Sequence, residues 1–160
     1  MPAAKLGPDD LITYMRTHGI EGEILRLNVP TPTVETAAQA VGARVEQIIK
    51  SILFLVDEQP VLAIACGTAN IGRRAIADLY GVGKKRIKLA SAEMVLEVSG
   101  FEVGAMPPFG HQRALPTLID QRVLDEPEAY AGGGAENALL RLNPGDIVRV
   151  SGAKVLDLIE

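Results

Sequence analysis

Hydrophobic and polar positions follow two different periods along this 160-residue chain, which predicts both helices and strands. Apolar residues recur at helical spacing after Pro8, and Thr33 and Ser91 each stand at the start of a further helical segment, where a hydroxyl can cap the first turn. Glycines mark the ends of these segments. We therefore expect helices ending at Gly19 and spanning about 33–41, 73–79, 91–99 and 147–150, with a short helical turn at 45–50.

Two strongly apolar runs are typical of buried strands. Ser51–Val56 and Val61–Cys66 flank the turn Asp57–Pro60, so they predict a hairpin inside a sheet. Further strand candidates lie at 23–29, 87–89, 115–120 and 138–142. Strands and helices do not alternate strictly, which predicts a mixed α/β (α+β) sheet rather than a doubly wound one. The length and the lack of an internal linker predict one domain over residues 1–160.

Composition narrows the class of protein. Hydrophobic residues make up 48% of the chain and aromatic residues only 4%, so the core must consist of Val, Leu, Ile and Ala. A net charge of -4 argues against a general nucleic-acid coat protein. Basic residues concentrate only at Lys84–Lys88, with Arg73 and Arg74 upstream. Such a cluster is either a solvated face or a contact for a phosphate backbone.

Cys66 is the single cysteine and lies within an apolar run, which predicts a buried core residue. A disulfide within the chain is impossible, and no cysteine pair suggests zinc. We expect no metal and no cofactor. The first ten residues contain no apolar signal segment, and no stretch approaches the ~20 apolar residues that span a membrane. These features predict a cytoplasmic protein with no membrane partner.

A segment rich in glycine and proline is the most informative part of the chain. It reads Gly100-Phe-Glu-Val-Gly104-Ala-Met-Pro107-Pro108-Phe-Gly-His111. Proline and glycine exclude a helix interior, whereas the apolar residues Phe101, Val103, Met106 and Phe109 argue against a floppy linker. The composition predicts a stiff, partly buried loop. Such a loop either connects two elements or brings bare N–H groups close to a ligand.

Three further positions could carry chemistry, each with a structural alternative. Lys50 borders an apolar run, so it either reaches to solvent or points into a site that binds phosphate or carboxylate. His111 is either a hydrogen-bonded structural residue or a base. Gly132–Gly134 forms either a bulge or a close backbone approach. Because no nucleophile triad or metal motif is present, an enzyme of this sequence would act by positioning and desolvation.

These features occur in an order that resembles the YbaK-like aminoacyl-tRNA deacylases, relatives of the prolyl-tRNA synthetase editing domain. The resemblance runs from about Thr33 to Asp157. It is carried by Thr36-Ala-Ala-Gln-Ala, Ile48-Ile-Lys50-Ser51-Ile-Leu-Phe, the Gly100–His111 segment, and the three glycines followed by Leu140-Arg-Leu-Asn-Pro144. It implies a mixed, curved, barrel-like sheet flanked by helices.

The resemblance also implies an activity, namely hydrolysis of the ester that joins a mischarged small amino acid to tRNA, with tRNA(Pro) as the expected carrier. Lys50 corresponds to the family lysine and would hold the terminal nucleotide. The Gly104–Pro108 loop would hold the ester and orient water, which a ribose hydroxyl helps to activate. The implied catalytic residues are Lys50, Gly104, Pro108 and His111. The implied substrate-binding residues are Ser51, Ala105, Met106, Pro107, Phe109, Gly110, Gly132, Gly133 and Gly134.

Partners and substrate identity stay open within this resemblance. It implies the acceptor end of an aminoacyl-tRNA as a partner. It leaves open whether prolyl-tRNA synthetase is a further partner, what the oligomeric state is, and whether the substrate amino acid is alanine, cysteine or serine. Many relatives have an arginine soon after the glycines, where this chain has Gly134-Ala135-Glu136. Two other hypotheses are a non-catalytic module that binds tRNA or a synthetase, and a hydrolase for another small ester.

Overall fold

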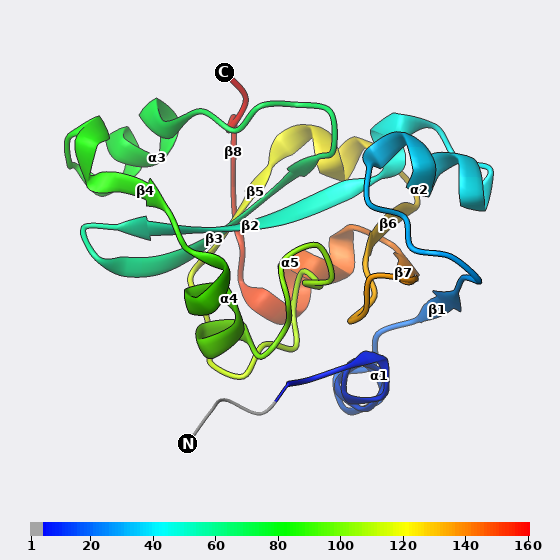
Figure 1. Ribbon diagram of the computed structural model, residues 1–160. Helices are drawn as coiled ribbons and strands as arrows, with labels where there is room; N and C mark the ends of the chain where they lie inside the picture. Colours follow the sequence, from blue (N-terminus) through cyan, green and yellow to red (C-terminus); the bar gives the residue numbers. More distant parts are fainter. Residues whose placement is uncertain (1–4) are drawn as a thin grey trace.

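Helices surround two sheets in the computed structural model, which describes residues 5–160 (Figure 1). The first four residues of the segment used to predict a cytoplasmic protein lie outside this range. The helices of the described part are α1 (Pro8–Thr17), α2 (Val34–Val41), α3 (Arg73–Tyr80), α4 (Ala92–Ser99) and α5 (Gly145–Ser151). Short 3₁₀ turns occupy Val45–Gln47 (η1), Lys84–Arg86 (η2) and Gln121–Asp125 (η3).

The strands form one mixed sheet and one antiparallel sheet. The five-stranded sheet has the order β4-β2-β3-β5-β8, and the three-stranded sheet has the order β1-β7-β6. β3, β5 and β8 are parallel neighbours, whereas β2 is antiparallel to both β3 and β4. The strands are β1 (Gly22–Arg26), β2 (Ile49–Val56), β3 (Gln59–Cys66), β4 (Ile87–Leu89), β5 (Thr117–Asp120), β6 (Ala129–Gly132), β7 (Ala138–Leu142) and β8 (Lys154–Leu156).

The predicted mixed α/β fold is confirmed, with one difference in how the strands close. The two sheets meet at a single bridge between Ile48 and Tyr130 and do not close into a barrel. The predicted hairpin is present, with Ile49 opposite Cys66 and Val56 opposite Gln59. This hairpin forms the centre of the larger sheet (Figure 1).

Both faces of the β2–β3 hairpin are buried, which explains its nearly continuous apolar sequence. Phe54 and Val61 pack in one cluster with Ile76 of α3. Leu53 and Leu62 point the other way, into the larger cluster that fills the space between the sheets and contains residues of α1, α4 and α5. A third cluster packs α2 against β6 and β7. The core is therefore divided by the hairpin.

The predicted helix ends agree with the structure because their capping residues act as expected. The Thr33 hydroxyl accepts a hydrogen bond of 3.1 Å from the Thr36 N–H at the start of α2. Gly42, Gly81 and Gly100 end α2, α3 and α4 with φ values of 70°, 67° and 84°, which favour glycine. Local chemistry therefore sets these boundaries.

Some predicted boundaries and elements were wrong. The strand expected at 23–29 ends at Arg26, and the helical turn expected at 45–50 gives way to β2 at Ile49. Strands β6 and β8 were not predicted. β6 contains a glycine and runs into the glycine segment, and β8 is a three-residue edge strand with two exposed residues. Neither has the alternating pattern that identifies a strand.

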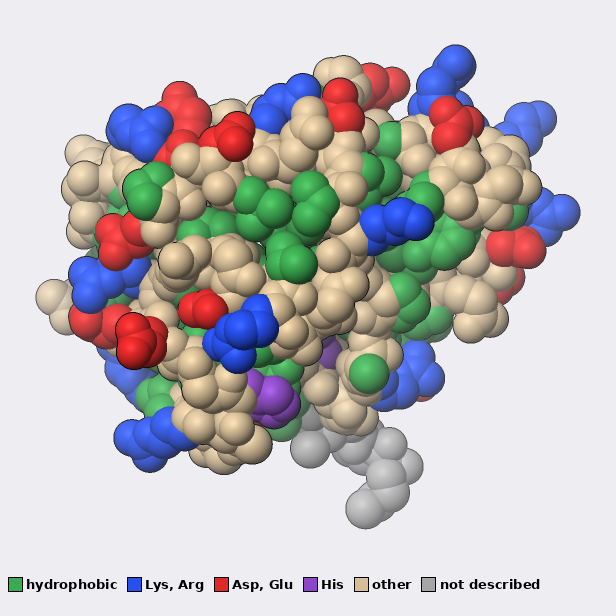
Figure 2. Space-filling model, turned by 180° about the vertical axis from the view of Figure 1, so that it is seen from behind, with side chains coloured by type: hydrophobic (Ala, Val, Ile, Leu, Met, Phe, Trp, Pro, Cys, Tyr) green, Lys and Arg blue, Asp and Glu red, His purple; other side chains and the backbone are tan. Residues whose placement is uncertain are grey.

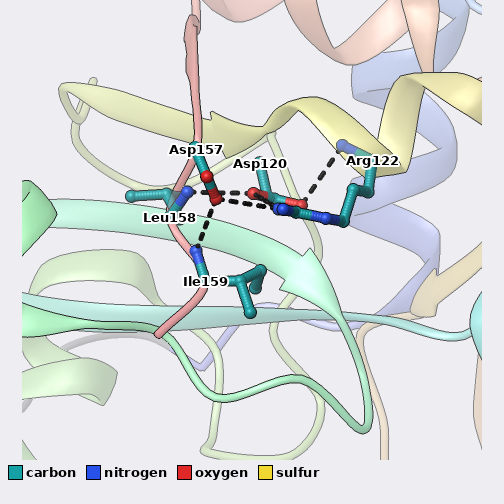
Figure 3. Close-up of polar contacts among 5 residues, drawn as sticks. All are labelled: Asp120, Arg122, Asp157, Leu158 and Ile159. Atoms are coloured by element: carbon teal, nitrogen blue, oxygen red, sulfur yellow. Dashed lines mark hydrogen bonds and ion pairs between the residues drawn. The ribbon is translucent and has the colours of Figure 1, made fainter.

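A buried carboxylate fixes the C-terminal segment to the sheet (Figure 3). Asp120, at the end of β5, is fully buried, and its Oδ1 accepts hydrogen bonds from the Leu158 N–H at 2.9 Å and from Arg122 Nη1 at 3.0 Å. Arg122 also donates to Asp157 at 2.8 Å, and this contact lowers the pKa of Asp157. The network holds residues 157–159 beside β5.

Candidate functional site

A small cavity of about 240 Å³ lies where α2, the start of β2, β6, β7 and the tip of the Gly/Pro loop converge. The Gly/Pro loop is residues 100–111. Five of the residues predicted for the site line this cavity, although they come from three distant parts of the chain: Lys50, Ser51, Gly104, Met106 and Gly132. We refer to this cavity as the ester pocket.

Lys50 is the only basic residue in the lining of the ester pocket, within the described chain. Its Nζ donates a hydrogen bond of 2.6 Å to the carbonyl of Ala69, and no carboxylate of the described residues lies within ion-pair distance. Burial lowers the pKa of Lys50 because desolvation disfavours its charge. A half-buried cation with spare donors can therefore hold an anion.

Ser51, another lining residue of the ester pocket, carries an unusual polar atom. Its Oγ is buried and has no hydrogen-bond partner among the described residues. A buried hydroxyl without a partner costs about 1–3 kcal/mol, so such groups are rare in folded proteins. Ser51 also lines the ester pocket, so its unpaired hydroxyl belongs to a residue that a ligand there would contact.

The Gly/Pro loop is partly buried, as the sequence predicts. Phe101, Met106 and Phe109 are buried, whereas Val103 is 63% exposed and lies at the ester pocket. Gly104 has a φ of 87°, a conformation that glycine adopts readily. No atom of the described residues lies within 4 Å of the position that a Cβ on Gly104 would take. Backbone conformation, not crowding, favours glycine there.

Backbone donors at the tip of the loop are free. Ala105 donates its N–H to the Glu102 carbonyl at 3.0 Å. The hydrogen bonds within residues 5–160 include none donated by the N–H groups of Gly104 or Met106, and both residues line the ester pocket. Two unpaired N–H groups on a stiff loop can stabilise negative charge on a carbonyl oxygen.

The glycine segment 132–134 packs directly against the Gly/Pro loop, so the two motifs form one unit. A Cβ at Gly132 would collide with the carbonyl oxygen of Met106 and would lie 2.9 Å from that of Ala105. The Gly134 N–H donates to the Ala105 carbonyl at 2.9 Å. These glycines allow a close approach between two backbones. Gly133 and Gly134 are buried and do not line the ester pocket.

His111 lies in a second cavity of about 210 Å³, together with Pro108, Phe109 and Gly110. Its Nε2 is 2.7 Å from the Pro107 carbonyl, so a neutral imidazole donates to the loop that carries Gly104. Burial lowers the pKa of His111 from 6.5 to about 4. The structure therefore separates Pro108–His111 from the ester pocket. Ala105 and Pro107 are buried between the two groups and line neither cavity.

Glu136 is a lining residue that the sequence analysis noted only as a departure from the family pattern. It is the single acidic residue in the lining of the ester pocket, within the described chain. Its position directly after the glycine segment was the available signal. Aliphatic side chains that were not predicted complete the wall, including Val34, Ala37 and Ala138.

Residues 5–160 bring together no group of three or more His, Cys, Asp or Glu side chains suited to a metal ion. Cys66 is half-buried rather than fully buried, and burial raises the pKa of its thiol, which disfavours a reactive thiolate. Within the same residues, no helix has the length and apolar character needed to cross a membrane.

Sequence comparisons find relatives whose similarity spans most of the chain. A family model described as the aminoacyl-tRNA editing domain matches residues 28–150. The uncharacterized protein YwhH of Bacillus subtilis is 27% identical over 146 residues, which cover 88% of this chain and 91% of YwhH. A proline–tRNA ligase of Bacillus cereus is 26% identical over 141 residues, which cover 87% of this chain but only 25% of the ligase.

Structural comparisons agree with the sequence matches. A crystal structure described as a proposed trans-editing enzyme for prolyl-tRNA synthetase superposes with a TM-score of 0.88 at 34% identity and covers 96% of each chain. The hypothetical protein APE2540 superposes with a TM-score of 0.87 at 28% identity, covering 94% of this chain and 99% of its own.

Proposed function

Because this chain belongs to the aminoacyl-tRNA editing domain family, the YbaK-like family, we propose that it is a trans-editing deacylase. It hydrolyses the ester between a mischarged small amino acid and the 3′ end of a tRNA. The match to a proline–tRNA ligase and the structural neighbour described for prolyl-tRNA synthetase support tRNA(Pro) as the carrier, with that synthetase as a further partner. The observation that carries the proposal is the set of unpaired groups in the ester pocket.

The two charges of the ester pocket complement the two charges of an aminoacylated nucleotide. Such a substrate carries a negative phosphate on one side of the ester and a positive α-ammonium on the other. Lys50 holds the phosphate, and Glu136, which lines the same pocket, pairs with the ammonium. The pair orients the ester without a covalent intermediate.

The free N–H groups of Gly104 and Met106 stabilise the transition state. Negative charge develops on the ester carbonyl oxygen when water adds to the carbon. Backbone donors that are already fixed in place are typically worth about 3–4 kcal/mol to that charge. The contact from His111 to Pro107 and the packing of the glycine segment hold these donors still. His111 is thus a positioning residue in this account.

Water is activated by the substrate itself. The hydroxyl next to the esterified ribose oxygen assists the attacking water, whose oxygen bonds to the carbonyl carbon. The ester C–O bond then breaks, the ribose oxygen takes a proton, and a free amino acid leaves a deacylated tRNA. The lining of the ester pocket offers no histidine or cysteine within the described residues, which supports this assignment.

The pocket selects small side chains by size. At about 240 Å³ it is smaller than most drug-sized sites, and Val34, Ala37 and Ala138 close its walls. A steric pocket rejects larger groups well but separates similar small ones poorly. Alanine, cysteine and serine therefore all fit the proposal, and the order among them requires measurement.

A substrate that lacks one hydroxyl tests the mechanism. We expect the purified protein to deacylate alanyl-, cysteinyl- or seryl-tRNA(Pro), and to lose at least 100-fold in kcat when the vicinal ribose hydroxyl of the charged adenosine is replaced by hydrogen. Binding of the deoxy substrate should be unchanged, as measured by competition. Full turnover of the deoxy substrate would contradict substrate assistance. Binding without release from any charged tRNA would favour the non-catalytic module.

A further inference from the structure

A second depression adjoins the ester pocket and shares Lys50 and Ile52 with it. This groove has a volume of about 280 Å³ and lies between β2, β4 and the segment that leads into α3. Its remaining lining is Phe54, Asn70, Ile71, Arg73, Lys84, Leu89 and Glu160. We call it the basic groove. Lys50 thus stands at the junction of the two hollows.

The cations of the basic groove are free to bind an anion. Within residues 5–160, neither Arg73 nor Lys84 forms an ion pair. Arg86 from the same basic cluster is instead paired with Asp57 at 2.8 Å. Figure 2 shows Lys and Arg side chains at the end of the molecule that carries α3 and β4 (right) as well as at the opposite end. The cluster therefore divides into paired and unpaired members.

The floor of the basic groove is apolar. Lys50, Ile52 and Phe54 alternate along β2, so they share one face of the strand. Leu89 of the edge strand β4 pairs with Phe54 and is 57% exposed, so the groove presents an aliphatic side chain to solvent. Nucleobases can pack on such a surface while their phosphates face the basic rim.

From this juxtaposition we propose that the basic groove binds the single-stranded nucleotides that precede the aminoacylated adenosine. The inference rests on the proposed function, because it extends the substrate away from the ester. Lys50 contacts the terminal phosphate, and Arg73 and Lys84 contact the next phosphates along the strand. The bases lie over Ile52 and Leu89.

Glu160 is the single acidic residue in the lining of the groove, within the described chain. Its N–H donates to the Asn70 carbonyl at 3.0 Å, which holds the residue beside the groove. A carboxylate there repels phosphate and weakens binding. The variant Glu160→Gln should therefore bind RNA more tightly than the natural chain, opposite to the effect of removing Arg73 or Lys84.

A two-substrate experiment tests the groove independently of the chemistry. The double variant Arg73→Ala/Lys84→Ala is compared with Arg74→Ala/Lys85→Ala, which removes two neighbouring exposed charges that do not line the groove. We expect the first variant to raise KM for aminoacyl-tRNA at least tenfold. It should leave hydrolysis of the corresponding aminoacyl-adenosine unchanged, because that substrate lacks the preceding nucleotides. The control variant should change both the KM for aminoacyl-tRNA and the rate of aminoacyl-adenosine hydrolysis less than threefold.

A direct measurement of RNA affinity tests the basic groove even if the protein hydrolyses no substrate. The probe is a labelled deacylated RNA that ends in the tRNA 3′ sequence, and its binding is followed by fluorescence anisotropy. The slope of log affinity against log salt concentration should be smaller by about 1.4 in the double variant, because two phosphate contacts to a single strand are lost. Equal affinity and slope for wild type and double variant would overturn the groove while leaving the deacylase proposal intact. Unchanged RNA binding together with absent hydrolysis would overturn both.

Discussion

At the residue scale, the most informative atom is one without a partner. Ser51 Oγ lies buried in the wall of the ester pocket and contacts no donor or acceptor of residues 5–160. A hydroxyl kept at a stability cost indicates a role outside folding. Neighbouring Lys50 also places a polar group in a partly buried position, where its ammonium has the Ala69 carbonyl as a hydrogen-bond partner. Both residues retain polar groups that the fold alone does not require.

The variant Ser51→Ala separates folding from function. Removing an unsatisfied hydroxyl should leave the free energy of unfolding unchanged or raise it by about 1 kcal/mol. The same change should lower kcat/KM for aminoacyl-tRNA roughly tenfold, because a substrate hydrogen bond is lost. Urea unfolding and deacylation kinetics measure the two effects. A variant that is less stable but fully active would show that Ser51 serves only the fold.

His111 makes the stability of the protein depend on pH. The unfolded imidazole binds a proton near pH 6.5, whereas in the folded protein the pKa of His111 is about 4. Between these values the unfolded chain binds more protons, so lowering the pH favours unfolding. The neutral imidazole therefore contributes about 3 kcal/mol to the free energy of unfolding above pH 6.5, and this contribution is lost as the pH falls to 4.

The variant His111→Gln measures this contribution, because glutamine can still donate to the Pro107 carbonyl but does not titrate. We expect wild type to lose about 3 kcal/mol relative to the variant between pH 7 and pH 4 in urea unfolding experiments. Parallel losses in both proteins would mean that the histidine takes up its proton as easily when folded as when unfolded.

At the element scale, the loop 100–111 and the glycine segment act as one support for the ester pocket. Three alanine variants distinguish crowding from conformation. Gly132→Ala should destabilise the protein by about 3 kcal/mol or more, because its Cβ meets the Met106 carbonyl. Gly104→Ala should cost only about 1 kcal/mol, from its positive φ, while it impairs deacylation. Gly83→Ala is the control, with open space and a φ of -76°.

Thermal unfolding and kinetics of the three variants give a clear order. Full activity in Gly104→Ala would make the tip of the loop a connector only. A Gly132→Ala protein as stable as Gly83→Ala would show that the two backbones can separate without cost.

Elements with strong local signals could be predicted from the sequence, and elements without them could not. The hairpin, the caps of α2 and α4 and the partial burial of the Gly/Pro loop follow from apolar runs, hydroxyl caps and the apolar residues between the glycines. β8 exists because β5 offers it a parallel neighbour and Asp120 binds the chain that follows. Such contacts between distant segments leave little trace in a short stretch of sequence.

At the scale of the whole molecule, the ester pocket is assembled from four separate segments of the chain, within residues 31–37, 48–52, 103–106 and 130–139. The resemblance of ordered motifs selected Lys50, Ser51, Gly104, Met106 and Gly132, which do lie together. The same resemblance placed His111 with them, but Pro108–His111 line a different cavity. Glu136 was missed as a lining residue because only folding shows that it lines the same pocket as Lys50.

Asp120 connects the sheet with the C-terminal segment that reaches the basic groove. The variant Asp120→Ala should destabilise the protein by about 3 kcal/mol, since it leaves the Leu158 N–H and part of Arg122 without partners. Asp157→Ala, at a half-exposed side chain, is the milder control. Hydrogen exchange at the Leu158 amide should accelerate in the first variant. Unchanged protection there would show that other contacts hold the segment.

The central claim is that the ester pocket hydrolyses an aminoacyl-tRNA with the help of Lys50. The most direct measurement is deacylation of a panel of charged tRNAs by wild type, Lys50→Ala and Lys50→Arg. We predict that wild type releases one small amino acid. Lys50→Ala should lose about 30-fold or more in kcat/KM, because a charged hydrogen bond worth about 2 kcal/mol is missing. Lys50→Arg should recover part of this loss. Equal release by wild type and a folded Lys50→Ala would contradict the claim.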